Sequence, residues 1–172
     1  MDLDMLAAIV DNMILQHDYP GFEPRSLKLG LPEQAYKASA KTFAQALAHD
    51  SVYVRLAALR WFQEKPGMAK THIHRIINLL SDKDEWVRKE TVRLLEKISS
   101  PPDDVGIKIS QLLKDADTEV RKEAAKALGK ILPKLKKMDS EILASLHAAA
   151  EDREVEVRWK AQKALRQLGE YN

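Results

Sequence analysis

Residues 114–129 read KDADTEVRKEAAKALG, and the pattern of this stretch recurs along the chain. Its Val-Arg pair, Val120-Arg121, reappears at Val54-Arg55, Val87-Arg88 and Val157-Arg158. The arginines at positions 55, 88, 121 and 158 are therefore 33, 33 and 37 residues apart. A period of this size indicates a fold built from repeated pairs of helices.

Composition limits the class of protein. The chain has 172 residues, of which 45% are hydrophobic and 31% charged, as in a globular domain with a core. It has no cysteine, which excludes disulfides, cysteine-bound metals and thiol catalysis. The longest apolar run, residues 5–10, is too short to span a bilayer. We therefore expect a cytoplasmic protein without a membrane partner.

The order of helix and turn signals predicts an all-α fold. We expect an N-terminal helix over residues 3–17, and its capping segment should extend to residue 34 through a loop rich in proline and glycine. Residues 35–172 should form a single structural domain with this cap. Its four helical hairpins are predicted at residues 33–66, 68–100, 103–133 and 139–170. The first helices should occupy residues 33–48, 69–80, 103–114 and 139–150, and the second helices residues 52–64, 84–98, 117–132 and 154–168.

Each predicted second helix carries a narrow apolar stripe at a spacing of four residues. The stripe should be buried, and it consists of Val54, Ala58 and Phe62; Val87, Thr91 and Leu95; Val120, Ala124 and Leu128; and Val157, Ala161 and Leu165. Aspartates such as Asp82, Asp115 and Asp152 stand in the turns before these helices. A carboxylate there can accept hydrogen bonds from free N–H groups and complement the positive end of a helix.

The motif D-x-D-x-x-V-R-x-x-A-A-x-A-L-G, complete in residues 115–129, resembles the HEAT repeat, in particular the phycobilisome-lyase type. Residues 82–98 and 152–169 match with substitutions. Residues 49–64 match least well, because Asp50 is displaced by one position and Trp61-Phe62 replace Ala-Leu. The resemblance implies a right-handed α-solenoid with the second helices on its concave face. It also implies that Arg55, Arg88, Arg121 and Arg158 are structural and bind turn aspartates of neighbouring repeats.

The concave face is the surface on which the resemblance places a partner. One position on it is cationic in all four repeats, and aromatic residues lie between the cations. The candidate partner-binding residues are Tyr53, Arg60, Trp86, Lys89, Arg93, Lys126, Trp159 and Lys163. Three interpretations remain open: a solvated face with internal Glu–Lys pairs, a site for an acidic protein or peptide, and a nucleic-acid site.

Catalytic and metal motifs are absent from the sequence. It contains no phosphate loop, nucleophile elbow or zinc-protease motif. HEAT-like hydroxylases hold iron with repeated His-Glu pairs, and no His-Glu occurs here. We therefore predict no catalytic residue, no metal and no cofactor.

The resulting hypothesis is a non-catalytic protein-binding scaffold, and its partner should be another protein or an acidic peptide. The alternative is a nucleic-acid-binding relative of the HEAT-like DNA glycosylases. Trp159, Leu165 and Leu168 lie on the last predicted helix, which no further hairpin covers. We therefore also predict association through the C-terminal repeat, with another copy or another protein.

Overall fold

The computed structural model describes residues 1–16, 31, 33–135 and 139–170. Its elements are α-helices and short 3-10 helices, and no described residue lies in a strand. The predicted all-α repeat fold is therefore confirmed. The predicted capping loop falls almost entirely outside the described residues.

The chain divides into two compact units, residues 1–90 and 91–172, and each is described here by itself. Their boundary falls within helix α6 (Glu85–Lys97), so the two halves of α6 are treated with different units. The prediction of a single domain, like the right-handed twist, stays a prediction.

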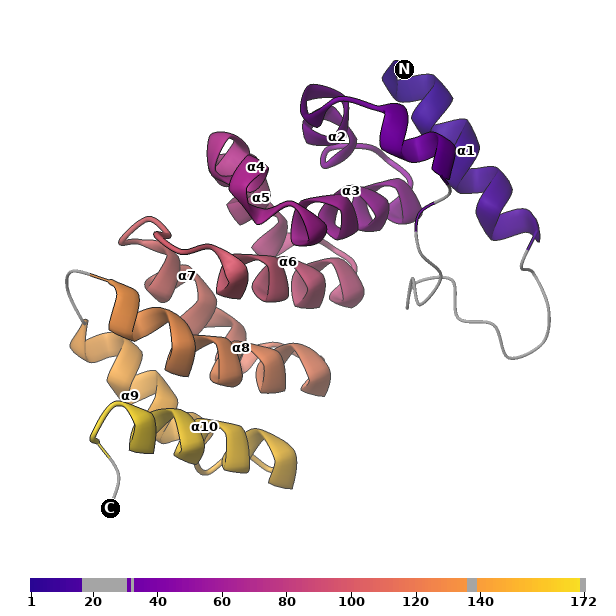
Figure 1. The fold of residues 1–172 in the computed structure, drawn as a ribbon. Coiled ribbons are helices and arrows are strands. Elements are labelled where there is room, and N and C mark those ends of the chain that lie inside the picture. Colours follow the sequence, from indigo (N-terminus) through magenta and orange to yellow (C-terminus); the bar gives the residue numbers. More distant parts are fainter. Residues whose placement is uncertain (17–30, 32, 136–138, 171–172) are drawn as a thin grey trace. The chain divides into compact units, whose positions relative to one another are not determined.

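Unit 1 begins with helix α1 (Leu3–Gln16), which packs against α2 (Ala40–Ala46) and α3 (Val52–Glu64) (Figure 1). The buried face of α1 includes Leu6 and Val10, both fully enclosed. The chain continues through four short segments, α4 (Pro66–Ala69), η3 (Lys70–His72), α5 (Ile73–Asn78) and η4 (Leu79–Ser81). An N-terminal helix therefore covers the first hairpin, as predicted.

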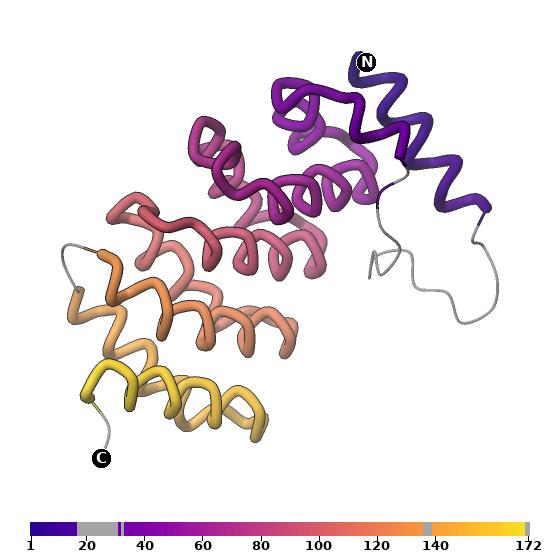
Figure 2. Tube along the Cα trace, viewed as in Figure 1, coloured from indigo at the N-terminus to yellow at the C-terminus, as the bar shows by residue number. Residues whose placement is uncertain are grey.

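Unit 2 consists of two layers of helices (Figure 2). One layer contains α7 (Val105–Gln111), extended by η5 (Leu112–Lys114), and α9 (Ser140–Ala149). The other contains α8 (Thr118–Ile131), followed by η6 (Leu132–Lys134), and α10 (Val155–Gln167). Helices α8 and α10 lie side by side, and each also packs against the first-helix layer.

The prediction of one continuous helix over residues 33–48 is wrong. The structure has a short 3-10 helix, η2 (Glu33–Lys37), and then α2 as a separate helix. The Ser39 hydroxyl accepts a hydrogen bond from the Thr42 N–H at 3.2 Å, which is the geometry of an N-cap. The single helix predicted over residues 69–80 is wrong in the same way, because α4, η3, α5 and η4 occupy this stretch. It also begins earlier, at Pro66, since proline suits the first position of a helix.

The predicted apolar stripe is confirmed. All twelve of its residues, three in each of α3, α6, α8 and α10, have no exposed surface. Because their side chains are short at the middle position, Ala or Thr, neighbouring helices can approach closely. The core thus follows the repeat.

Candidate binding surface

The repeated arginines hold the turn before their own helix. In every repeat the arginine Nη1 donates to the backbone carbonyls six and five residues earlier, at 2.7–3.2 Å. These four residues are Arg55, Arg88, Arg121 and Arg158. These two hydrogen bonds from Nη1 therefore fix the position of each guanidinium group, with its Nε and Nη2 atoms, beside the turn.

Two of these arginines also bind the turn aspartate of the following repeat. Arg55 in unit 1 pairs with Asp82 through its Nε and Nη2 atoms, both at 2.9 Å. Arg121 in unit 2 pairs with Asp152 through the same two atoms, at 2.9 and 3.2 Å. Both arginines are 5% exposed. Such two-pronged pairs join one repeat to the next.

The turn of the first hairpin uses a different residue type. Asp82, Asp115 and Asp152 each accept a hydrogen bond from the N–H two residues later, at 2.9 Å. In the first hairpin His49 does so, because its Nδ1 accepts from the Ser51 N–H at 3.1 Å. The apparent displacement of Asp50 is therefore a replacement of the turn aspartate by His49.

Arg158 on α10 is held like the others but has no carboxylate among the described residues. Its Nη1 donates to the carbonyls of Asp152 and Arg153 at 2.7 and 2.9 Å. No hydrogen bond or ion pair engages its Nε or Nη2 within the part of the chain that the structure describes. Arg158 is half-buried.

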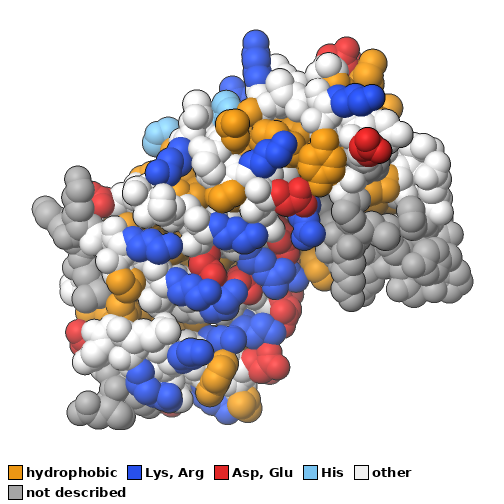
Figure 3. All heavy atoms as spheres, viewed as in Figure 1, with side chains coloured by type: hydrophobic (Ala, Val, Ile, Leu, Met, Phe, Trp, Pro, Cys, Tyr) orange, Lys and Arg blue, Asp and Glu red, His pale blue; other side chains and the backbone are white. Residues whose placement is uncertain are grey.

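Within unit 2, the predicted cationic positions Arg93 and Lys126 are already paired. Arg93 lies 3.4 Å from the buried Glu123, and Lys126 lies 2.6 Å from Glu123 and 3.3 Å from Glu96. Lys130 also donates to Glu96, at 2.5 Å. Figure 3 shows the resulting mixture of basic and acidic side chains over α8 and α10.

These pairs shift the pKa values of the groups involved. Burial raises the pKa of Glu96, but hydrogen bonds and charges from Lys130 and Lys126 outweigh it, so the pKa lies below its usual value. Burial lowers the pKa of Lys126, but Glu123 and Glu96 outweigh it and leave that pKa raised. This part of the surface is therefore a network of internal ion pairs, with much of its positive charge compensated.

A second group of ion pairs joins α8 to α10. Lys122 donates to Glu119 on its own helix and to Glu156 on α10, the latter at 2.7 Å. Hydrogen bonding and attraction from Lys122 lower the pKa of Glu156. Lys122 therefore also has its charge compensated.

The surface of α10 differs, because its cations surround an exposed ring. Trp159 is 50% exposed, and the side chains of Lys160 and Lys163 lie over its ring at 4.6 and 5.3 Å from the centroid. Val155, one turn earlier on the helix, is 68% exposed. Among the described residues, neither lysine has a carboxylate within 4 Å. The structure thus brings the predicted site residues Trp159 and Lys163 together with Lys160, beside the exposed apolar side chain of Val155.

In unit 1 the predicted site residues are more enclosed. The prediction that Lys89 is exposed is wrong, because only 6% of its surface is exposed. Its Nζ lies 3.5 Å from the centroid of the half-buried Trp86, so the ammonium group makes a cation–π contact with the ring. Arg60 pairs with Glu64 at 3.2 Å, and Tyr53 is half-buried.

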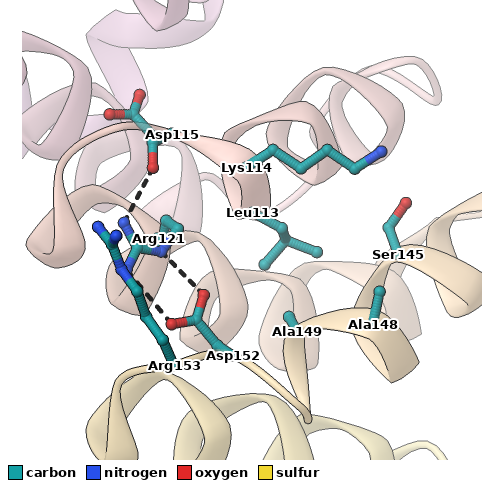
Figure 4. A pocket seen from close by; sticks show the side chains of 9 residues that line it. All are labelled: Leu113, Lys114, Asp115, Arg121, Ser145, Ala148, Ala149, Asp152 and Arg153. Carbon is teal, nitrogen blue, oxygen red and sulfur yellow. Dashed lines mark hydrogen bonds and ion pairs between the residues drawn. The ribbon is translucent and has the colours of Figure 1, made fainter.

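A groove of about 390 Å³ in unit 2 is lined by residues of η5, α8 and α9 and of the turns before α8 and α10 (Figure 4). The Arg121–Asp152 pair closes one end of it, and Ser145 stands at the other. The Ser145 hydroxyl donates to the Glu141 carbonyl at 2.9 Å, and no histidine is among the described residues that line the groove. The groove therefore has no paired nucleophile and base.

Two further properties follow from the described residues. They contain no cluster of three or more His, Asp or Glu side chains arranged to hold a metal ion. Within the same ranges, no helix has the length and apolarity needed to cross a membrane.

Comparison with known proteins identifies the repeat. The model of the family described as HEAT repeats matches residues 108–171, which include α8, α9 and α10. The sequence of residues 108–171 is therefore similar to HEAT repeats. The predicted HEAT-repeat character is thus confirmed, while the narrower likeness to the phycobilisome-lyase type stays a prediction. No curated protein matches the chain.

Solved structures show the same helical repeat fold as this chain. An engineered protein of the Northeast Structural Genomics Consortium is 21% identical with a TM-score of 0.60, and the match covers 98% of this chain and 85% of that one. A designed armadillo repeat protein is 17% identical with a TM-score of 0.55, and the match covers 97% and 87% of the two chains. At these identities the likeness concerns the helical repeat fold alone.

Proposed function

We propose that this HEAT-repeat protein is a non-catalytic scaffold that binds an acidic segment of another protein on the exposed surface of its second helices. The observation that carries the proposal is the α10 surface, where Trp159 is half exposed between Lys160 and Lys163. Exposed tryptophans are enriched among residues that dominate binding energy. The two lysines add attraction for carboxylates.

Absence of a catalytic arrangement supports a binding role. Among the described residues that line the groove of unit 2, the Ser145 hydroxyl donates to a backbone carbonyl, Asp152 is held by Arg121, and Asp115 accepts the Asp117 N–H. The remaining candidate residues Arg93 and Lys126 serve the proposal less directly, because Glu123 and Glu96 compensate their charges. We therefore centre the docking surface on α10.

The test begins by capturing partners of the full chain from extracts of its source cells, then measuring the affinity of a purified partner for variants. Trp159→Ala should weaken binding by about tenfold or more, because it removes the anchor. The pair Lys160→Glu and Lys163→Glu should weaken it most at low salt, where charges are least screened.

A matched control is Lys108→Glu on α7, which reverses an exposed charge in the other helix layer. It should leave the affinity nearly unchanged. A partner that binds the Trp159→Ala variant as tightly as the unmodified chain would show that the docking surface lies elsewhere. An equal loss from Lys108→Glu would mean that only overall charge matters.

A further inference from the structure

We propose that Arg158 is a docking point for a turn carboxylate of a partner protein, and that the partner element is a helical hairpin. The inference rests on the proposed function and names the class of partner for the same α10 surface. Its basis is the difference between Arg158 and the arginines that occupy the same position in two other repeats.

The first step is the pose of the guanidinium. Arg55, Arg121 and Arg158 all donate Nη1 to the two carbonyls of the preceding turn. In Arg55 and Arg121 the other edge of the guanidinium then grips an aspartate, Asp82 or Asp152 respectively. Arg158 is fixed by the same carbonyls, so its Nε and Nη2 are already positioned for a carboxylate.

The second step is the kind of group that fits. The aspartates that fill this position come from the turn between two helices, and each also accepts the N–H of the residue two positions later. A planar guanidinium edge binds a carboxylate through two parallel hydrogen bonds and so selects its orientation. A hairpin whose turn carries an aspartate therefore matches Arg158, and its helices would rest on Val155 and Trp159.

The third step concerns a second copy of this chain as the occupant. The corresponding turn of its first hairpin carries His49, whose Nδ1 is already bonded to the Ser51 N–H, in place of an aspartate. Helix α1 also packs on both helices of that hairpin, α2 and α3. The first hairpin of another copy thus lacks the required carboxylate, which favours a different protein.

The experiment uses the full chain and, as the probe, a fluorescently labelled peptide of residues 139–170. This peptide contains a hairpin sequence whose Asp152 is already recognised by an arginine of this type. Arg158→Ala should weaken binding of the peptide by about tenfold or more. Arg153→Ala is the control, because Arg153 is a neighbouring cation with its side chain 74% exposed, and it should change the affinity less than about twofold.

Asp152→Asn in the peptide should cost as much as Arg158→Ala in the chain, and the two losses should not add. Equal effects of Arg158→Ala and Arg153→Ala, additive losses, or no binding would overturn the proposal. The same hairpin joined to the end of the chain, at high effective concentration, avoids dependence on the peptide's own folding. In this extended chain, Arg158→Ala should increase the rate of amide hydrogen exchange in the added hairpin. An unchanged exchange rate would overturn the proposal.

Two further outcomes separate the alternatives. A dimer in sedimentation velocity that Arg158→Ala abolishes would make a second copy the occupant and overturn the choice of a different protein. If a captured natural partner loses affinity with Trp159→Ala but not with Arg158→Ala, the proposed function stands and the role of Arg158 fails.

Discussion

At the residue scale, the arginine of each repeat does two tasks with two edges of one guanidinium. One edge closes its own turn, and in Arg55 and Arg121 the other edge reaches the aspartate of the next repeat. Lysine could supply the charge but not the planar fork, since it has a single donor group. The residue type is therefore set by geometry more than by charge.

The pair Arg121–Asp152 predicts how stability depends on pH. Burial raises the pKa of Asp152, but hydrogen bonds from Arg121 and the Glu154 N–H outweigh it, so the pKa in the folded chain is lowered. A lowered folded pKa means that the pair stabilises the fold fully above the unfolded value, about 3.9, and that this contribution is lost as the pH falls below it. Urea unfolding of the full chain at several pH values should show this loss.

Asp152→Asn is the variant that isolates this contribution. It should reduce the free energy of unfolding at neutral pH by about 2–4 kcal/mol, because Arg121 is left buried without its anion. The difference from the unmodified chain should shrink as the pH falls below about 4. Two pH curves that stay parallel would mean that Asp152 does not stabilise the fold as an anion.

At the element scale, Gly129 sets the distance between α8 and α10. A Cβ added at Gly129 would lie 2.7 Å from the Gln167 side chain and 3.0 Å from both the Cα and the Cβ of Ala164. The glutamine can move aside, but the Ala164 backbone belongs to α10 and moves only with that helix. Alanine at position 129 would therefore force the two helices apart.

Gly129→Ala is consequently expected to destabilise unit 2, although alanine is by itself the better helix former by about 1 kcal/mol. We expect a net loss of about 1–2 kcal/mol in the free energy of unfolding, since overpacking of this kind costs more than the propensity gains. Chemical denaturation followed by circular dichroism measures it. Gly67→Ala is the control, because a Cβ there meets nothing within 4 Å. A more stable Gly129→Ala variant would show that α10 shifts at little cost.

At the scale of the whole molecule, the net charge of +2 hides a strong internal compensation. Residues 1–50 carry 4 cations and 7 anions, and residues 51–100 carry 10 and 6. Within unit 2, carboxylates already pair with Arg93, Lys122, Lys126 and Lys130. A polyanion such as DNA would have to compete with those carboxylates for each of these four cations.

We therefore expect weak binding of duplex DNA. Fluorescence anisotropy with a short labelled duplex should give a shallow salt dependence, because Arg93, Lys122, Lys126 and Lys130 must first leave their carboxylates before they can displace condensed counterions. The double variant Glu96→Gln and Glu123→Gln should steepen the salt dependence by releasing Lys126 and its neighbours. Tight binding by the unmodified chain, with a steep loss of affinity as salt rises, would favour the nucleic-acid alternative.

The sequence by itself determined the repeat, the second helices and the buried stripe. Its period of 33 residues and the spacing of Val120, Ala124 and Leu128 suffice, because burial of one face of a helix leaves a local periodic signal. The second helices, such as α3 at Val52–Glu64, were predicted within one or two residues for the same reason. The break between η2 and α2 was not predicted. Ser39 begins α2 as its N-cap, but a serine within an otherwise helical pattern does not by itself show that the helix starts there.

Only the tertiary structure decided which cations are compensated. Arg60, Arg93, Lys126 and Lys163 are equivalent in sequence, yet Glu123 and Glu96 pair with the middle two while Lys163 lies over Trp159. Glu123 lies three residues before Lys126 on α8, and Trp159 lies four residues before Lys163 on α10, so sequence spacing alone could suggest these two contacts. The pairs Arg93–Glu123 and Lys126–Glu96 instead join α6 to α8, and no spacing within one helix reveals them. Likewise, the motif gives Arg121 and Arg158 the same role. Only packing of the following turn gives Asp152 to Arg121, whereas none of the described residues offers Arg158 a carboxylate. Ion pairs between repeats depend on distances across the fold, which sequence periodicity does not encode.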